Sequence, residues 1–210
     1  MKLKSLIAAG VIAAIAPLVH AIGPELIVNG GFESSTFTGP YTTFLAGSTA
    51  LTGWTIGGDS VDLINTYWSP ASGSYSLDLS GNNDGTISQS FATTIGQKYQ
   101  VSFSMAGNPD DTDKLKTVQV GLYDQGFYTF DASGKSHTNM GWLNKSFQFT
   151  ATDTSSTLFF TGTQESPYGV ALDNISVSAV PEPEMLAMML AGLGVIGAVA
   201  RRRRTDLSKK

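Results

Sequence analysis

The stretch Tyr99-Gln-Val-Ser-Phe-Ser-Met105 alternates large apolar side chains with small polar ones. A period of two puts one set on each face of a β-strand, so this stretch predicts a strand with one buried face. Similar alternation or a short apolar run recurs at residues 26–28, 76–79, 87–91, 118–122, 147–149, 158–160 and 171–177. Turns rich in Gly, Asn, Asp and Ser separate these segments. The sequence predicts an all-β domain of eight to ten short strands, folded as an antiparallel two-sheet jelly-roll sandwich.

Residues 22–179 have an acidic charge balance that the whole chain conceals. Five lysines and no arginine stand against fourteen Asp and Glu, a net charge of −9, whereas the complete chain carries −4. A nucleic-acid partner is excluded, because it requires a basic surface. The absence of cysteine excludes thiol catalysis and thiolate metal sites.

The two ends of the chain predict export. Residues 1–21 combine Lys2 and Lys4 with an apolar run, as a secretory signal peptide does, and the run is short for the alternative, a permanent anchor. Near the other end, the 16 uncharged residues 185–200 precede four arginines at 201–204, which predicts a transmembrane helix with a cytoplasmic flank. The alternative, a buried core helix, is disfavoured by the arginines and by the lack of a polar face.

The C-terminal 31 residues, 180–210, resemble a PEP-CTERM sorting signal. The matching residues are Pro181, Glu182 and Pro183, then the hydrophobic helix, then Arg201, Arg202, Arg203 and Arg204. The resemblance implies a Gram-negative bacterium that makes exopolysaccharide. It also implies that an exosortase cuts near the motif after transient anchoring in the inner membrane. The product would then stay at the cell surface or become extracellular.

Two carboxylates stand in unusual places for a sheet protein. Glu33 ends the segment Asn29-Gly-Gly-Phe-Glu33, and Asp173 shares its strand parity with Ile175 and Val177. A buried carboxylate needs a partner, and basic side chains are scarce here. We therefore hypothesise one structural Ca²⁺ held by Glu33 and Asp173. In the alternative interpretation Asp173 bonds to nearby backbone and Glu33 lies in water.

A family resemblance rests on the blocks "LIVNGGFE", "GWTIGGDSVDLI", "GSYSLDLSG", "ISQSFATTIGQKYQVSFSMAGNPD", "NMGWLNKSFQFTAT" and "YGVALDNISV". These blocks, between residues 25 and 177, resemble the choice-of-anchor C family of bacterial surface proteins. That family is similar to plant cell-wall proteins with tandem galactose-binding-like domains. The resemblance implies a jelly-roll domain exported to the envelope. In similar carbohydrate-binding jelly rolls, a Glu after Asn-Gly-x-Phe and an Asp in the last strand ligate calcium, which implies those roles for Glu33 and Asp173.

Aromatic residues in predicted loops indicate a surface that binds an extracellular polysaccharide. The candidate ligand-binding residues are Tyr67, Trp68, Trp142 and Tyr168. Aromatic faces stack on sugar rings while neighbouring polar groups bond the hydroxyls. Tyr67 and Trp68 precede Ser69-Pro70 and are expected in an exposed loop. Trp54 begins a short apolar strand with Ile56 and is expected in the core.

No catalytic motif accompanies these residues. His137 is the single histidine after the signal peptide, and neither Gly-x-Ser-x-Gly nor His-Glu-x-x-His occurs. Asp110, Asp111 and Asp113 lack the glycine and distal glutamate of an EF-hand and predict a solvated loop. We expect a non-catalytic binding protein. The alternatives are a structural or adhesion protein of the extracellular matrix and, with less support, a hydrolase.

Overall fold

The computed structural model describes residues 23–35, 37–122, 125–181 and 191–197. Within them the chain forms eleven strands. They are β1 (Tyr41–Leu45), β2 (Thr55–Gly58), β3 (Ser60–Ile64), β4 (Ser76–Asp78), β5 (Gly85–Ala92), β6 (Lys98–Gly107), β7 (Leu115–Gly121), β8 (Gln125–Asp131), β9 (Leu143–Thr150), β10 (Ser155–Gly162) and β11 (Val170–Ala179).

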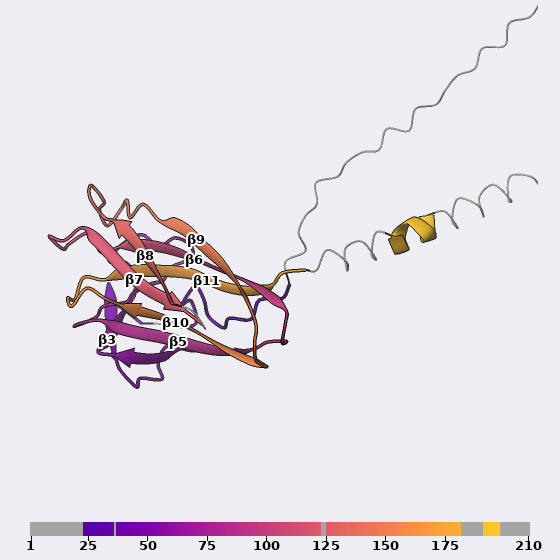
Figure 1. Cartoon of the computed structure of the whole chain (residues 1–210). Helices are drawn as coiled ribbons and strands as arrows, with labels where there is room; N and C mark the ends of the chain where they lie inside the picture. The colour runs from indigo at the N-terminus through magenta and orange to yellow at the C-terminus, as the bar shows by residue number, and fades with distance from the viewer. Residues whose placement is uncertain (1–22, 36, 123–124, 182–190, 198–210) are drawn as a thin grey trace, which may run out of the picture.

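The strands form two antiparallel sheets that pack face to face (Figure 1). The six-stranded sheet has the order β1-β3-β4-β11-β6-β9, and the five-stranded sheet has the order β2-β5-β10-β7-β8. Neighbours far apart in sequence, such as β4 and β11, show that the chain crosses repeatedly between distant positions. The arrangement confirms the predicted two-sheet jelly-roll sandwich.

The hydrophobic core lies between the sheets and follows the alternation of the strands. Tyr99, Val101, Phe103 and Met105 of β6 are all buried, as their spacing predicts. Phe103 meets Phe160 of β10 edge to face, with ring centroids 5.2 Å apart. Because all core residues lie between Ile27 and Val177, the fragment 22–181 contains the complete fold.

Two sequence expectations about strands need correction. Residues 26–28 do not form a strand. The Leu26 N–H donates to Val177 O, but the Val177 N–H donates to the Glu25 carboxylate and not to a backbone carbonyl, so no β-ladder continues from this bond. Three strands, β1, β3 and β8, were not predicted. Their patterns are short or lack clear alternation, and they are held by pairing with neighbours.

The first and last described parts of the domain leave it at the same end (Figure 1). A Cβ built at Gly23 would lie 3.1 Å from Ala179 O. The Val180 N–H donates to Lys98 O, and Gln97 Nε2 donates to Val180 O, both at 2.8 Å. Val180 is therefore bonded to the folded domain, and no free segment separates the domain from Pro181.

Several predicted segments lie partly or wholly outside the described residues. These are the signal peptide 1–21, Glu182, Pro183, Arg201–Arg204 and most of the hydrophobic segment 185–200. Residues 191–197 of that segment are helical. Among the described residues, no helix has the length and apolar character needed to span a membrane.

Candidate functional site

Glu33 and Asp173 converge on one loop, residues 71–75, which covers the outer face of the six-stranded sheet. Glu33 Oε1 accepts the N–H groups of Ser74 and Tyr75, at 2.8 and 2.9 Å. Asp173 Oδ2 accepts those of Ala71 and Ser72, at 2.9 and 3.0 Å. The two carboxylates thus join the first and last parts of the domain through the loop between β3 and β4.

Asp173 is buried for a different reason from the one its sequence parity suggested. The β6–β11 register shifts between Asp173 and Ser176, where Asn174 has a φ of 50°. Because of this bulge, Ile175 and Val177 face the core, whereas Asp173 pairs with Ser104 on the outer face. The parity argument was therefore wrong, and the loop 71–75 is what buries the carboxylate.

The oxygen atoms around Glu33 and Asp173 can be compared with those that a calcium ion needs. Burial, together with a smaller effect of the nearby Glu33 charge, raises the pKa of Asp173 to about 6, although backbone hydrogen bonds to the carboxylate oppose the shift. Glu33 Oε2 accepts no hydrogen bond from the described residues. The described part of the chain offers no group of three His, Cys, Asp or Glu side chains for a metal. Glu33 and Asp173 fit a calcium ion only with backbone oxygens as the remaining ligands, so calcium stays a prediction.

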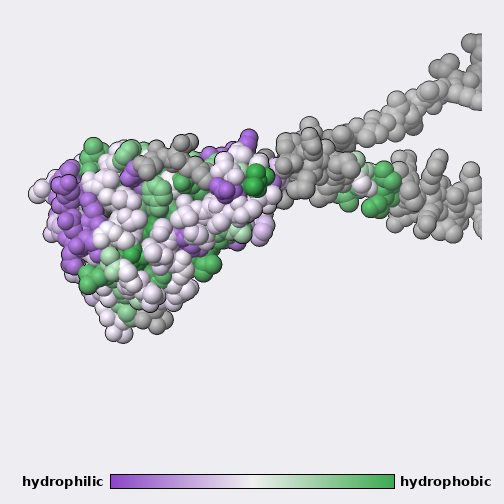
Figure 2. All heavy atoms as spheres, turned by 60° about the horizontal axis from the view of Figure 1, so that its bottom comes forward, coloured by the Kyte–Doolittle hydropathy of each residue, from purple (hydrophilic) through white to green (hydrophobic). Residues whose placement is uncertain are grey.

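A separate cleft of about 430 Å³ opens on the outer face of the six-stranded sheet. Its floor comes from β1, β3 and β4, and its rim comes from the loops that follow β3, β4, β6 and β10. Since β11 runs ten residues from the cleft to Ala179, the cleft lies about 30 Å from Ala179. Figure 2 shows that strongly hydrophilic residues gather at the end of the domain opposite the termini.

Two carboxylates form the floor of the cleft. Asp62 of β3 and Asp78 of β4 are direct cross-strand partners and therefore point to the same face. Asp78 is fully buried and accepts only N–H donors, from Ser80, Gly169 and the Asn108 side chain. Burial raises the pKa of Asp78 to about 8, although these hydrogen bonds oppose the shift.

Asp62 is less enclosed than Asp78. Its Oδ1 accepts the Thr43 hydroxyl at 2.6 Å, and no described residue donates to Oδ2. Burial raises the pKa of Asp62 as well. The cleft floor therefore holds acceptor oxygens whose protein partners are all uncharged.

Tyrosines form the walls of the cleft. Tyr41 and Tyr168 are 47% and 39% exposed, and both line the opening. Tyr67 lines the same cleft and meets Tyr41 edge to face, with ring centroids 5.4 Å apart. The predicted ligand-binding residues Tyr67 and Tyr168 therefore come together in one cleft.

The two predicted tryptophans occupy other positions. Trp68 borders the cleft but is only 3% exposed, and its Nε1 donates to Ser76 Oγ at 2.8 Å. The expectation that Trp68 lies exposed in a loop is wrong, because its loop packs the indole against the sheet. Trp142 is half-buried, donates to Ser69 O, and does not line the cleft. Trp54 is in the core, as expected.

Asp110 and His137 both contact Tyr67, which lines the cleft. Asp110 Oδ2 accepts the Tyr67 hydroxyl at 2.6 Å, and both carboxylate oxygens lie within 3.0 Å of His137 Nε2. The His137 ring also packs on Tyr67, with centroids 4.5 Å apart. His137 is thus a surface residue with a defined role in orienting Tyr67.

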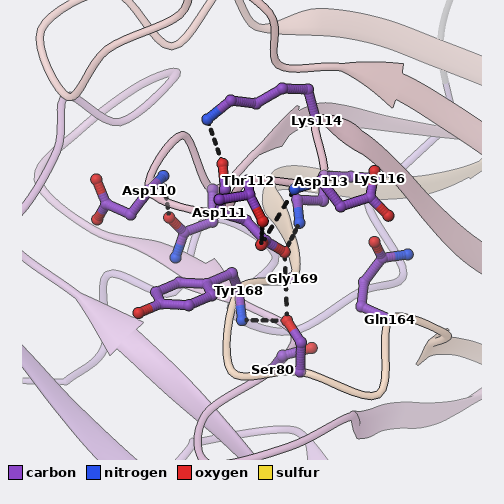
Figure 3. Close-up of polar contacts among 12 residues, drawn as sticks. Ser80, Asp110, Asp111, Thr112, Asp113, Lys114, Lys116, Gln164, Tyr168 and Gly169 are labelled. Carbon is purple, nitrogen blue, oxygen red and sulfur yellow. Dashed lines mark hydrogen bonds and ion pairs between the residues drawn. The ribbon is translucent and has the colours of Figure 1, made fainter.

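The acidic loop that follows β6 is more structured than the sequence predicted. The Asp111 carboxylate pairs with Lys116, whose side chain is completely buried (Figure 3). Lys114 donates to Pro109 O. Burial opposes ionisation of Asp111, but the Lys116 hydrogen bond and charge outweigh it and lower the pKa. The pair anchors the rim of the cleft beside Asn108.

Sequence reasoning missed Tyr41, Asp62, Asp78 and Asn108. A usable signal was present: Val61-Asp-Leu63 and Leu77-Asp-Leu79 each place a carboxylate between two apolar residues. Such an Asp faces away from the core, and two pairing strands bring the two together. The pairing itself was not predictable from either segment.

Two family models match this chain, and they meet where the last strand of the domain ends. A family model described as "Protein of unknown function (DUF642)" matches residues 25–178. The chain belongs to the DUF642 family. A PEP-CTERM protein-sorting motif matches residues 179–204, directly after the DUF642 domain. The narrower resemblance to choice-of-anchor C proteins stays a prediction.

A sequence relative and two solved structures resemble this DUF642 protein. Halomucin from Haloquadratum walsbyi (strain DSM 16790 / HBSQ001) is 35% identical over 174 residues, which are 79% of this chain and 2% of halomucin. The chain thus spans a very small part of that relative. An arabinose-bound α-L-arabinofuranosidase is 18% identical with a TM-score of 0.51, over 77% of this chain and 27% of the enzyme. That likeness shows the fold alone.

The second structure is TmCBM61 in complex with β-1,4-galactotriose. It is 16% identical to this chain with a TM-score of 0.47, over 74% of this chain and 98% of TmCBM61.

Proposed function

We propose that this DUF642 protein is an exported envelope or extracellular protein that binds a polysaccharide without catalysis. The cleft between Tyr41, Tyr67 and Tyr168 is the binding site, and its construction is the observation that carries the proposal. Its volume of about 430 Å³ falls in the usual range of about 300–1,000 Å³ for small-ligand sites. Exposed aromatic faces beside carboxylate and amide groups suit sugar rings and their hydroxyls.

The export part of the proposal rests on the PEP-CTERM motif at residues 179–204. The signal peptide delivers the chain to the inner membrane, and an exosortase cuts near Pro181. The cleft lies at the end of the domain away from the tail, so it points away from the membrane while the chain is tethered. The domain is able to bind a glycan both before and after processing.

Absence of catalysis is part of the proposal. Among the described residues that line the cleft there is no His, Cys or Lys to serve as base or nucleophile. Asp62 and Asp78 make a glycosidase the reaction to test. We expect no turnover of aryl glycosides by the fragment 22–181, whereas turnover that disappears in Asp78→Asn would contradict this part of the proposal.

The binding function is tested by removing a wall of the cleft. In a glycan-array and calorimetry experiment, Tyr168→Ala should weaken binding about ten-fold, because a stacking face is lost. Phe127→Ala is the matched control, since Phe127 is 65% exposed on β8 of the other sheet. Failure of the wild-type fragment to bind any polysaccharide, or equal loss in both variants, would refute the proposed site.

A structural or adhesion role without glycan binding is the second candidate. Exposed apolar side chains lie on strands at the edges of the sheets, with Leu45 on β1, Phe127 on β8 and Leu143 on β9. Such edges can contact other proteins or copies of this chain. Displacement of the protein from its extracellular matrix by soluble sugar favours glycan binding, and retention favours adhesion.

A further inference from the structure

The floor of the cleft presents acidic oxygens that lack a cationic partner within the protein. Asp62 and Asp78 face the same side of paired strands, and their donors are a hydroxyl, backbone amides and the Asn108 side chain. The two ion pairs formed by the described residues lie elsewhere, at Asp111 and Asp110. A carboxylate moved from water into such a site gains most from a positive charge beside it.

The walls also favour a cation. Tyr41, Tyr67 and Tyr168 line the same opening, and the negative face of a phenol ring attracts an ammonium group. Asp110 holds the Tyr67 hydroxyl at 2.6 Å, so the orientation of that ring is fixed before a ligand arrives. A sugar ring that carries an ammonium group would meet an aromatic wall and an acidic floor together.

We propose that the cleft takes an amino-sugar chain, with a protonated hexosamine nitrogen bound at Asp62 above Asp78. This inference rests on the proposed glycan-binding function and names its ligand class. The ammonium group donates to Asp62 Oδ2, the oxygen that no described residue donates to, and lies beside the Tyr168 face. An ammonium has three donors and no acceptor, which suits the acceptor oxygens of Asp62.

The charge of the whole domain supports the same ligand class. Residues 22–179 carry a net charge of −9, which attracts a polycationic glycan over long range and repels a polyuronate. Acetylation of the amine removes both the charge and two donors. The cleft should therefore discriminate between glucosamine and N-acetylglucosamine on the same polymer backbone.

The test compares three oligosaccharides of equal length by calorimetry with the fragment 22–181 at pH 6 and about 0.15 M salt, where surface attraction is screened. They are a β-1,4-linked glucosamine tetramer, its fully N-acetylated form and a uronic-acid tetramer. We expect the glucosamine tetramer to bind about ten-fold or more tightly than the acetylated one. The uronic-acid tetramer should bind most weakly. This arm needs only the wild-type protein.

Two Asp→Asn substitutions, which each remove one negative charge, test whether the preference for glucosamine arises at Asp62. Asp62→Asn keeps an acceptor for Thr43 and should reduce the glucosamine-to-acetylated affinity ratio to about one. Asp153→Asn removes one carboxylate from the exposed β9–β10 turn, at the end of the domain away from the cleft, and should leave the ratio unchanged. An equal reduction in both variants would assign the preference to general surface charge and overturn the inference.

Other outcomes separate this inference from the proposed function. If the acetylated or uronic tetramer binds as well as glucosamine and Tyr168→Ala weakens it, glycan binding stands and the amino-sugar inference falls. If glucosamine binding requires Ca²⁺, the carboxylates hold a metal and the inference also falls. If no glycan of any kind binds, both fail.

Discussion

At the residue scale, Asp78 illustrates how burial and hydrogen bonding act against each other in this domain. Its side chain is 1% exposed, and its partners are all N–H donors, which suit the ionised form. Burial nevertheless raises its pKa to about 8, because the charge is removed from water with no cation nearby. The free energy of unfolding therefore depends on pH through Asp78.

We expect the free energy of unfolding to fall as pH rises from about 4 to about 8. In this window the unfolded chain releases the Asp78 proton and the folded domain retains it, so ionisation favours unfolding. The slope from this residue is at most about 1.4 kcal/mol per pH unit. Asp173, with its pKa of about 6, acts in the same direction in the lower part of the window.

Urea denaturation at pH 5 and pH 8 measures this dependence. Asp78→Asn should reduce the slope whatever its effect at a single pH, since it removes the titrating group. The lowered pKa of Asp111 acts below pH 4 and does not offset the trend. Stability that rises over this pH range in the wild type would contradict the argument.

At the scale of elements, the loop 71–75 joins Glu33, near the start of the domain, to Asp173 in its last strand. Its backbone N–H groups donate to Asp173 at the start of the loop and to Glu33 at its end. Gly73 sits at its centre with a φ of 63°, and a Cβ there would lie 2.2 Å from Glu33 Oε1. The loop therefore needs glycine for both its conformation and its contact with Glu33.

Gly73→Ala should lower the free energy of unfolding by about 2–4 kcal/mol, combining backbone strain with loss of the Glu33 hydrogen bonds. Gly47→Ala is the control, because Gly47 has a φ of 81° but no atom within 4 Å of a built Cβ. It should cost only about 1 kcal/mol. Urea denaturation of both variants gives the comparison, and equal losses would show that the Glu33 contact has no energetic weight.

Calcium belongs to the same loop. If Glu33 and Asp173 hold a calcium ion, EDTA should lower the melting temperature of the wild-type fragment, because a ligand bound only to the folded state stabilises it. Scanning calorimetry with EDTA or about 1 mM Ca²⁺ measures the shift, which should be lost in Glu33→Gln. An unchanged melting temperature would refute the calcium site.

At the scale of the whole molecule, the cleft and the described chain ends lie at opposite ends of the domain. The described chain ends meet near Gly23 and Val180, and the cleft lies at the opposite end of β11. In the proposed function, this polarity separates processing from binding. Val180, which directly precedes the Pro181-Glu-Pro183 motif, lies against the folded domain, since Gln97 and Lys98 hold it by hydrogen bonds.

Processing of the chain can be followed by mass. In the native host, replacing Pro181, Glu182 and Pro183 with alanine should leave most of the protein as the longer, membrane-associated form. Lys210→Ala, outside the three parts of the signal, should be processed normally. Immunoblotting and intact-mass measurement distinguish the forms, and a mature wild-type product that still contains Lys210 would contradict cleavage.

Individual residues show how far sequence reasoning reaches. The alternation in residues 99–105 predicted β6 and its buried face. Tyr67 and Tyr168 were predicted as ligand-binding residues, and the structure places both in one cleft, but their role in binding stays a prediction. Trp68 was misplaced, because its burial depends on a sheet surface that its own segment does not contain. Asp173 was expected to be buried for a reason that the bulge at Asp173–Ser176 removes.

The sequence by itself determined the β-class of the domain, its acidic charge and the C-terminal sorting motif, since periodicity, composition and linear motifs are local properties of the chain. The tertiary structure alone decided which side chains meet. Asp62 faces Asp78 through the register of β3 and β4, and Glu33 reaches Asp173 through a loop that covers the sheet. The physical reason is that strand register and loop packing are set by contacts between distant segments, which no single segment encodes.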